Sequence, residues 1–190
     1  SPSLVNGYWK NPQATQDLMR GDWLPVGDLA RADAEGYIHI VGRKKEIYKN
    51  RQGQTIAPQR VENLFRDFEA VSQAFLVGDH REYNTLIVWP NPASAALAGK
   101  RPEQVLELLS SVVASANRFL APFERVVAFQ VLPRALDAEH GELTHKQTFK
   151  REVVERNWSA LIDKMYEQKH LVLSIDGAFF RIPNWLLREM

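Results

Sequence analysis

The chain contains no cysteine, which excludes disulfide bonds and thiolate zinc sites. It also lacks any apolar run near the roughly 20 residues that a membrane-spanning helix needs, and no signal peptide opens the sequence. The 24 lysine and arginine residues and the 23 aspartate and glutamate residues are mixed along the chain, so the formal net charge is only +1. A one-sided basic surface is therefore not expected, and nucleic-acid binding is disfavoured.

What is present is typical of a globular protein, with 45% hydrophobic and 25% charged residues among 190. This length suits one domain, or one domain with part of another. The first residue is Ser1 rather than Met, from which we expect an excised or processed product. The absence of cysteine is compatible with a cytoplasmic location, and peripheral association with a membrane is left open.

Residues 1–43 are rich in turn signals such as Asn6-Gly7 and Asn11-Pro12, and residues 37–41 are the clearest strand among them. This stretch is too short to bury a core of its own, so we expect it to be the β-rich end of a larger N-terminal domain. The domain boundary is predicted near residues 43–45. The apolar tail over residues 170–190 is expected to pack against another surface.

Residues 44–169 are expected to form an α+β domain, a small sheet of about three strands flanked by helices. Pro58 and Pro102 suit the first turns of two helices, each followed by apolar residues at helical spacing. A third helix is predicted over residues 154–165 from the same spacing. Continuous β-prone runs predict strands at residues 71–77, 85–89 and 126–132.

Three local signatures follow one another along the chain. Residues 7–12 read Gly-Tyr-Trp-Lys-Asn-Pro, and residues 22–29 read Asp-Trp-Leu-Pro-Val-Gly-Asp-Leu. Residues 36–47 read Gly-Tyr-Ile-His-Ile-Val-Gly-Arg-Lys-Lys-Glu-Ile, followed by Ile-Ala-Pro-Gln at 56–59. Residues 141–144 read Gly-Glu-Leu-Thr and precede a basic helix start. Over residues 4–166 the chain thus resembles the adenylate-forming (AMP-binding) superfamily, and Ile-Ala-Pro-Gln is most similar to its long-chain fatty acyl-CoA synthetases.

The resemblance implies a two-step reaction. A carboxylic acid reacts with ATP to give an acyl-adenylate and pyrophosphate, and the thiol of CoA then displaces AMP. In the family, a large N-terminal domain binds ATP and the acid, and a small C-terminal lid rotates between the two steps. Mg2+ is expected with ATP, bound by residues outside this chain, and no metal site is expected within it.

Several nucleotide contacts are implied by the resemblance. Asp28 matches the ribose-binding carboxylate, and a carboxylate can accept hydrogen bonds from vicinal hydroxyls. Arg43 matches an arginine near the ribose and phosphate, where a permanently charged, multidentate group is suited. Ile40 is placed in the same nucleotide site. Val26 departs from the family, which usually has threonine there. Without this context, a turn and a surface arginine would explain Asp28 and Arg43 equally well.

Lys45 falls at the family's hinge position, where a few residues absorb the backbone change as domains rotate. Lys49 matches a lysine that serves the second conformation in some relatives. Gly53 lies in the loop that lines the CoA tunnel, although the family often has two glycines where this chain has Gln52-Gly53. A solvated basic turn is the simpler interpretation of residues 43–45.

The third signature departs from the family at the lysine that stabilises charge during adenylation. Aligning Lys150-Arg151 with the family's basic pair puts Gln147 or Thr148 at that position, and Thr148 also suits a helix N-cap. Two interpretations stay open. Lys146 acts from one or two residues away, or the lysine is absent and adenylation is slow or lost.

The family's phosphate-binding loop and acyl pocket lie upstream of these 190 residues, so negligible adenylation is expected from the chain alone. The leading hypothesis is therefore the lid of a longer acyl-CoA synthetase. A separately encoded subunit that completes an N-terminal AMP-binding domain, and a non-catalytic interaction or nucleotide-sensing module, are the alternatives. Acyl-chain specificity and oligomeric state are not predicted.

Overall fold

A three-stranded sheet forms the centre of the larger part of the fold. In the computed structural model, which describes residues 5, 7–21, 23–167, 170–175 and 178–183, the strands run in the order β5 (Val71–Val77), β6 (Asn84–Pro90) and β7 (Val126–Val131). β5 pairs antiparallel with β6, whereas β6 pairs parallel with β7. Parallel neighbours need a crossover connection, and α3 (Pro102–Asn117) supplies it here.

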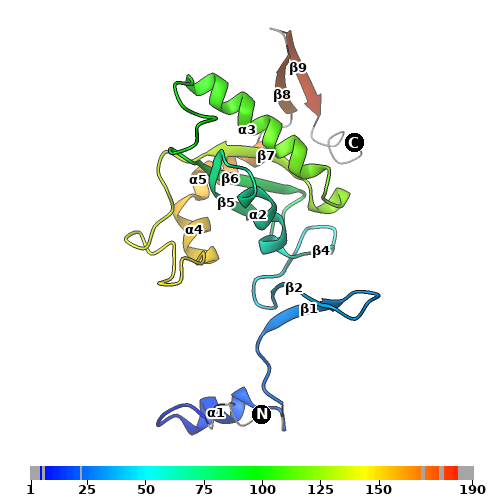
Figure 1. Ribbon diagram of the computed structural model, residues 1–190, viewed down its shortest axis with the longest axis vertical. Helices are drawn as coiled ribbons and strands as arrows, with labels where there is room; N and C mark the ends of the chain where they lie inside the picture. The colour runs from blue at the N-terminus through cyan, green and yellow to red at the C-terminus, as the bar shows by residue number, and fades with distance from the viewer. Residues whose placement is uncertain (1–4, 6, 22, 168–169, 176–177, 184–190) are drawn as a thin grey trace. The chain divides into compact units, whose positions relative to one another are not determined.

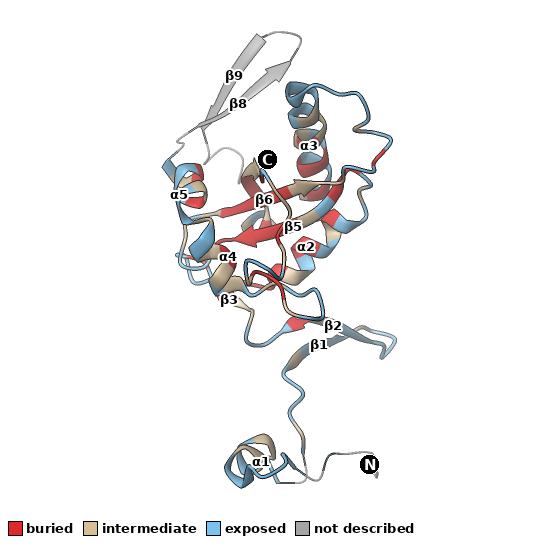
Figure 2. Cartoon of the chain, turned by 90° about the vertical axis from the view of Figure 1, so that its left-hand side faces the viewer, coloured by how far each residue is buried: buried red, intermediate tan, exposed pale blue. Residues whose placement is uncertain are grey.

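Helices cover both faces of this sheet (Figure 2). α2 (Pro58–Arg66) and α3 pack on one face, and α4 (Arg151–Asn157) and α5 (Ser159–Glu167) pack on the other. The alternation of side chains along β5 explains the two cores, because Ala74 and Leu76 face α2 and α3 while Phe75 and Val77 face α4 and α5. The result is a three-layer arrangement, and it confirms the predicted α+β class.

Two short hairpins accompany the layers (Figure 1). β3 (Tyr48–Lys49) pairs antiparallel with β4 (Thr55–Ile56), and β8 (His170–Ile175) pairs antiparallel with β9 (Ala178–Pro183). A single 3-10 turn, η1 (Pro122–Glu124), precedes β7. The backbone N–H of His80 donates to the Lys49 carbonyl at 2.9 Å, and that of Arg51 donates to the Arg81 carbonyl at 2.8 Å. These bonds attach the β3–β4 hairpin to the loop between β5 and β6.

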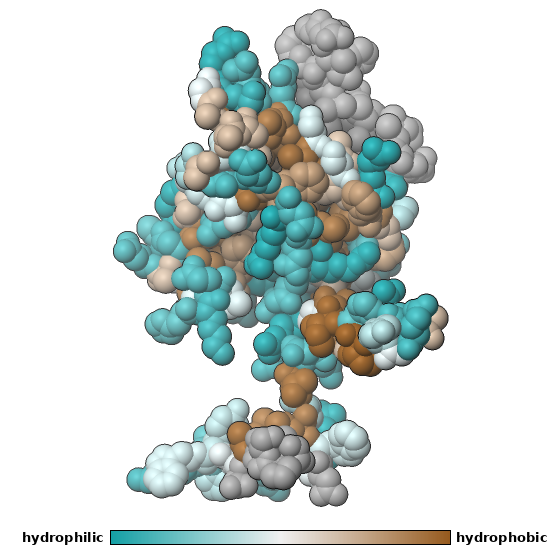
Figure 3. Space-filling view, viewed as in Figure 1, coloured by the Kyte–Doolittle hydropathy of each residue, from teal (hydrophilic) through white to brown (hydrophobic). Residues whose placement is uncertain are grey.

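The chain divides into two units, Ser1–Lys45 and Glu46–Met190. The first unit contains α1 (Pro12–Leu18) and the antiparallel pair β1 (Asp28–Ala32) and β2 (Ile38–Arg43). Ile38 is 67% exposed and Ile40 is 68% exposed. Figure 3 shows apolar side chains at the surface near the β1–β2 hairpin. The described residues of the first unit thus leave the hairpin's apolar side chains uncovered.

The structure corrects several sequence-based predictions. The third helix is broken at Trp158, whose backbone leaves the helical region (φ −110°, ψ 16°) while its indole donates to Glu142. Thr148 is not the N-cap, because α4 begins after Lys150 and the Thr148 hydroxyl bonds to Thr144 at 2.6 Å.

The helix α1 and the hairpins β3–β4 and β8–β9 were not predicted from the sequence. The predicted tail forms β8 and β9, but its side chains lie outside the described residues. None of the helices that the structure describes is long and apolar enough to cross a membrane.

A buried ion pair joins the layers of the second unit. Arg151 Nη1, at the start of α4, donates to the Glu62 carboxylate on α2 at 2.8 Å, and Nη2 donates to the carbonyl of Leu76. The backbone N–H of Leu76 also donates to Glu62 at 2.9 Å. The Arg151 guanidinium lies over the Phe75 ring, 4.2 Å from its centroid. One guanidinium therefore connects a helix on each side of the sheet to the edge strand β5.

We expect Arg151→Ala to destabilise the chain by about 3–5 kcal/mol, because Glu62 would keep a buried charge without its partner. Arg51→Ala is the matched control. It removes an exposed ion pair with Glu82, and such pairs contribute roughly 0.2–1 kcal/mol. Urea unfolding followed by tryptophan fluorescence measures both, and equal effects of the two substitutions would contradict this account.

Candidate functional site

Two of the predicted nucleotide contacts lie side by side. Asp28 begins β1 and Arg43 ends β2, and these residues are directly opposite each other in the antiparallel register. Arg43 Nε lies 2.8 Å from Asp28 Oδ1, and both side chains remain partly accessible. Ile40 lies three residues earlier on β2, with an exposed side chain. The hairpin thus brings together residues that are 15 positions apart in the sequence, and presents them at its open end.

The chain turns immediately after this pair. Residues 44–46 form a turn, and the backbone N–H of Lys44 donates to the carbonyl of Gly27 at 2.9 Å. Lys45, the predicted hinge residue, is the last residue of the first unit. Within the second unit, the side-chain amide of Gln59 donates to Glu46 at 2.6 Å. Hydrogen bonds therefore engage both neighbours of Lys45, through the backbone of Lys44 and the side chain of Glu46.

Lys49 and Gly53 lie in and beside the β3–β4 turn. Asn50, which sequence analysis missed, organises this turn because its buried amide oxygen accepts hydrogen bonds from the backbones of Gln52 and Gln54. Gly53 has φ +80°, and nothing among the described atoms lies within 4 Å of where a Cβ would stand. Backbone conformation, rather than crowding within this chain, therefore favours glycine at this position.

Lys146 lies in a closed loop over residues 144–148, exposed to solvent. The backbone N–H of Thr144 donates to the Thr148 carbonyl at 2.9 Å, and that of Gln147 donates to the Thr144 carbonyl at 2.9 Å. Gln147 has φ +58°, a region that non-glycine residues seldom adopt. A bridge between Leu143 and Phe149 closes the base of the loop. Lys146 is thus held on a different loop from Lys49 and Gly53.

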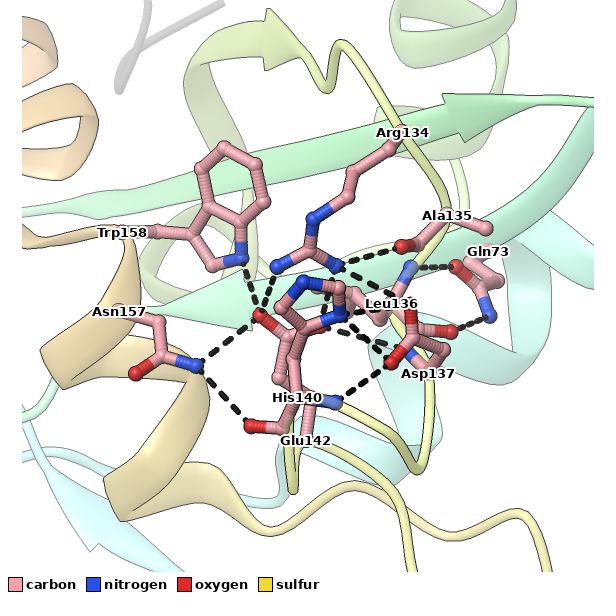
Figure 4. Close-up of polar contacts among 9 residues, drawn as sticks. All are labelled: Gln73, Arg134, Ala135, Leu136, Asp137, His140, Glu142, Asn157 and Trp158. Carbon is pink, nitrogen blue, oxygen red and sulfur yellow. Dashed lines mark hydrogen bonds and ion pairs between the residues drawn. The ribbon is translucent and has the colours of Figure 1, made fainter.

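The glutamate of the Gly-Glu-Leu-Thr signature anchors this loop (Figure 4). Glu142 is fully buried, and Arg134 donates to its two carboxylate oxygens at 2.7 and 2.8 Å. Trp158 Nε1 and Asn157 Nδ2 donate to the same carboxylate at 2.9 and 3.2 Å. The backbone N–H of Asp137 completes the set at 3.2 Å. Sequence patterns do not mark a buried carboxylate, so its role could not be predicted.

These contacts decide the protonation of Glu142. Burial alone would raise the pKa of its carboxyl, but the hydrogen bonds from Arg134, Asn157, Asp137 and Trp158 outweigh burial, and the pKa is lowered from 4.5. Glu142 is therefore ionised at neutral pH.

Asp137, His140 and Glu142 also come within 4.8 Å of one another. Their lone pairs are already used, however, since Asp137 bonds to the His140 ring at 2.8 and 2.9 Å and Glu142 faces the Arg134 guanidinium. A cation there would have to displace Arg134. The cluster is therefore better described as a structural hydrogen-bond network than as a metal site.

Comparison with known proteins matches residues 48–170 to the family of AMP-binding enzyme C-terminal domains. The chain belongs to this family. The long-chain fatty-acid–CoA ligase FadD15 of Mycobacterium tuberculosis is 30% identical over 181 residues, which cover 87% of this chain but 30% of the relative. Long-chain fatty-acid–CoA ligase 5 of mouse is 32% identical over 183 residues, which cover 87% of this chain and 26% of that enzyme. The chain thus spans less than a third of the length of these relatives.

Solved structures give the same fold. The adenylation domain of a carboxylate reductase from Mycobacterium chelonae superposes with a TM-score of 0.73 at 21% identity, covering 86% of this chain and 26% of that one. The corresponding domain from Segniliparus rugosus, in complex with AMP and a carboxylic acid, gives 0.70 at 25% identity with the same coverage. The chain therefore shares its fold with part of these adenylation domains.

We expect Glu142→Gln to destabilise the chain by about 1–3 kcal/mol at pH 7, because the Arg134 cation would lose its charged partner. A carboxyl with a lowered folded-state pKa contributes stability above its ordinary pKa of 4.5 and loses that contribution as the pH falls through the folded value. The difference from the wild type should therefore shrink between pH 7 and pH 3.

Urea unfolding at the two pH values measures this difference. Glu139→Gln changes an exposed glutamate three residues before Glu142, so it serves as the control and should have little effect at either pH. A difference between wild type and Glu142→Gln that stays constant from pH 7 to pH 3 would contradict the assignment.

Proposed function

We propose that this chain is the lid and hinge of an ATP-dependent acyl-CoA synthetase acting on a fatty acid, and that it is inactive alone. The observation that carries the proposal is the position of Lys45. It lies at the junction of two units, directly after the Asp28–Arg43 pair and before a unit that presents Gly53 and Lys146 on separate loops. The matches to long-chain fatty-acid–CoA ligases support the substrate class.

In the first half-reaction, an acid carboxylate oxygen bonds to the α-phosphorus of ATP, and the bond from that phosphorus to the bridging oxygen of pyrophosphate breaks. In the second, the CoA sulfur bonds to the acyl carbon and AMP leaves. Asp28 accepts hydrogen bonds from the ribose hydroxyls, and Arg43 holds Asp28 and contacts the phosphate side of the nucleotide. Ile40 provides an apolar contact on the same strand.

The apolar side chains of the β1–β2 hairpin support an N-terminal partner domain. Large apolar side chains left exposed on a small hairpin favour burial against another surface. The first unit is therefore proposed to complete the domain that binds ATP, Mg2+ and the acid, with Mg2+ bound by residues outside this chain.

Of the basic residues near the third signature, Lys146 is the best candidate for the adenylation lysine. Arg151 is engaged by Glu62 and Leu76, so its charge is not available to a substrate. Lys146 lies in a loop held in shape by its own hydrogen bonds, with an exposed side chain that can reach a developing negative charge. Its long side chain compensates for a displacement of one residue from Gln147 or two residues from Thr148.

In the complete enzyme, we expect Lys146→Ala to reduce acyl-adenylate formation by about two to three orders of magnitude, the usual effect of removing one such electrostatic contact. Thiolation of preformed acyl-adenylate should be unchanged. Pyrophosphate release measures the first step, and acyl-CoA formation from synthetic acyl-adenylate measures the second.

Lys150→Ala, a change to an exposed lysine four residues away, is the control and should leave both steps near wild type. The double change Lys146→Ala with Thr148→Lys should restore adenylation, because it returns a lysine to the same loop. If Lys146→Ala alters neither step, Lys146 is not the adenylation lysine.

Gly53→Ala in the complete enzyme should slow thiolation about tenfold while leaving adenylation unchanged. An alanine at φ +80° strains the loop by about 1–2 kcal/mol and adds a methyl group facing the CoA tunnel. Gly99→Ala is the matched control, because Gly99 has φ +69° and an equally open surrounding but lies elsewhere. Equal thiolation rates in the two variants would remove Gly53 from the CoA site.

Thr148 favours one alternative. The resemblance puts Gln147 or Thr148 at the position of the family's lysine, and the Thr148 hydroxyl bonds to Thr144. A non-catalytic interaction or nucleotide-sensing module is therefore the second candidate function. A separately encoded subunit that completes an N-terminal AMP-binding domain would preserve the chemistry and differ only in covalent connection. The Lys146→Ala experiment separates the catalytic proposals from the non-catalytic one.

A further inference from the structure

The turn between β3 and β4 depends on one residue. The backbone N–H groups of Gln52 and Gln54 both donate to Asn50 Oδ1, at 3.1 and 2.9 Å. The Asn50 carbonyl accepts from the Gly53 N–H at 2.9 Å, and the Asn50 N–H donates to the Gln54 carbonyl at 3.1 Å. Its side-chain amide also donates to Gln54 Oε1 at 2.9 Å. Every hydrogen bond that the structure describes for residues 52–54 therefore has Asn50 as its partner.

The Asn50 side chain supports the turn from its buried side. Asn50 is 4% exposed, whereas Gln52 and Gly53 are exposed. Short carboxamide side chains favour turns because they can bond to backbone N–H groups a few residues further along. Three of the five bonds use the side chain of Asn50, so they are specific to this residue type. The conformation of the turn, including the φ of +80° at Gly53, is thus fixed from inside the fold.

Other residues hold the flank of the turn. The Tyr48 hydroxyl donates to Asn84 Oδ1 at 2.8 Å in the core. Gly78 leaves room for this contact, because a Cβ there would lie 2.6 Å from the Tyr48 hydroxyl oxygen. The backbones of Lys49 and Arg51 are bonded to the loop between β5 and β6. A change at Asn50 is therefore expected to loosen residues 52–54 while β3 stays attached.

The turn presents backbone groups to its surroundings. The carbonyls of Gln52 and Gly53 accept no hydrogen bond from any residue that the structure describes. Nothing among the described atoms lies within 4 Å of where a Cβ of Gly53 would stand. A turn that is already fixed holds these groups in place before a ligand arrives. Such preorganisation strengthens binding, because less conformational entropy is lost when the ligand binds.

We propose that Asn50 is a positioning residue for thioester formation, which acts through Gly53 by holding the turn in the conformation that admits CoA. The inference rests on the proposed function, since only there does this turn meet CoA. If the competent conformation is populated only in part, the apparent affinity for the ligand falls in proportion to that population. Saturating CoA restores the population, so Asn50 should act on the KM for CoA rather than on kcat.

In the complete enzyme, Asn50→Ala should raise the KM for CoA about tenfold in the thiolation of preformed acyl-adenylate. The kcat of thiolation and the rate of adenylation should stay near wild type. A loss of folded enzyme would instead lower the rates of both half-reactions.

Asn91→Ala is the matched control. Asn91 Oδ1 also accepts from a backbone N–H two residues on, that of Ala93 at 3.1 Å, and its amide donates to the Glu69 carbonyl at 2.9 Å. Asn91 follows β6 at the opposite end of that strand from Asn84. Equal KM values for CoA in Asn50→Ala and Asn91→Ala would overturn the proposal.

Asn50→Asp tests whether the acceptor oxygen is responsible. An aspartate keeps oxygen acceptors for both backbone N–H groups, and the Gln54 amide can rotate to donate to it. In the 190-residue chain, amide hydrogen exchange followed by 15N NMR should be about tenfold faster at Gln52 and Gln54 in Asn50→Ala. It should be close to wild type in Asn50→Asp. Unchanged exchange in Asn50→Ala, or equally fast exchange in both variants, would overturn the proposal.

The two proposals can fail separately. Calorimetric titration of the complete protein with CoA measures affinity without any reaction. If Asn50→Ala weakens CoA binding, Asn91→Ala does not, and no acyl-adenylate forms from ATP and a fatty acid, the role of Asn50 stands and the proposed function fails. If the complete protein forms acyl-CoA and both variants bind CoA as the wild type does, the proposed function stands and the role of Asn50 fails.

Discussion

The geometry of the Lys146 loop depends on one buried carboxylate. Glu142 accepts hydrogen bonds from a guanidinium, an indole, an amide and a backbone N–H, and these donors come from the segment before it and from the junction of α4 and α5. A buried charge with all its lone pairs used tolerates little movement, because any lost bond leaves a desolvated charge. The loop that begins two residues later is therefore fixed at its base while its tip stays in solvent.

The same reasoning extends to the whole second unit. Glu62 and Arg151 connect a helix on each side of the sheet through Leu76 on the central layer. The Gln73 side chain adds a paired contact, donating to the Leu136 carbonyl and accepting from the Leu136 N–H at 2.9 and 2.7 Å. These polar contacts lie between two apolar cores and fix the positions of the helices relative to the sheet. The proposed rotating lid requires a unit that moves as a rigid body, and these contacts favour one.

Sequence patterns predicted the layers well but the site only in part. Strand 71–77 and the helix beginning at Pro58 follow from periodicity and proline placement, because burial on a sheet imposes those patterns locally. The Asp28–Arg43 contact depends on hairpin register, and a bulge between Leu29 and Ala30 shifts that register, so residue spacing alone could not give the pairing. Glu142 and Asn50 escaped detection because their partners are distant in sequence or are backbone groups. The break at Trp158 follows from a side-chain bond that periodicity does not record.

The distribution of cations gives a further argument about where chemistry can occur. Arg60, Arg134 and Arg151 face buried glutamates, and their charges are neutralised within the fold. Arg66 and Lys146 lie at the surface, and neither has a carboxylate partner among the described ion pairs. A charge that is paired inside stabilises structure, whereas a charge left in solvent is available to an anionic ligand.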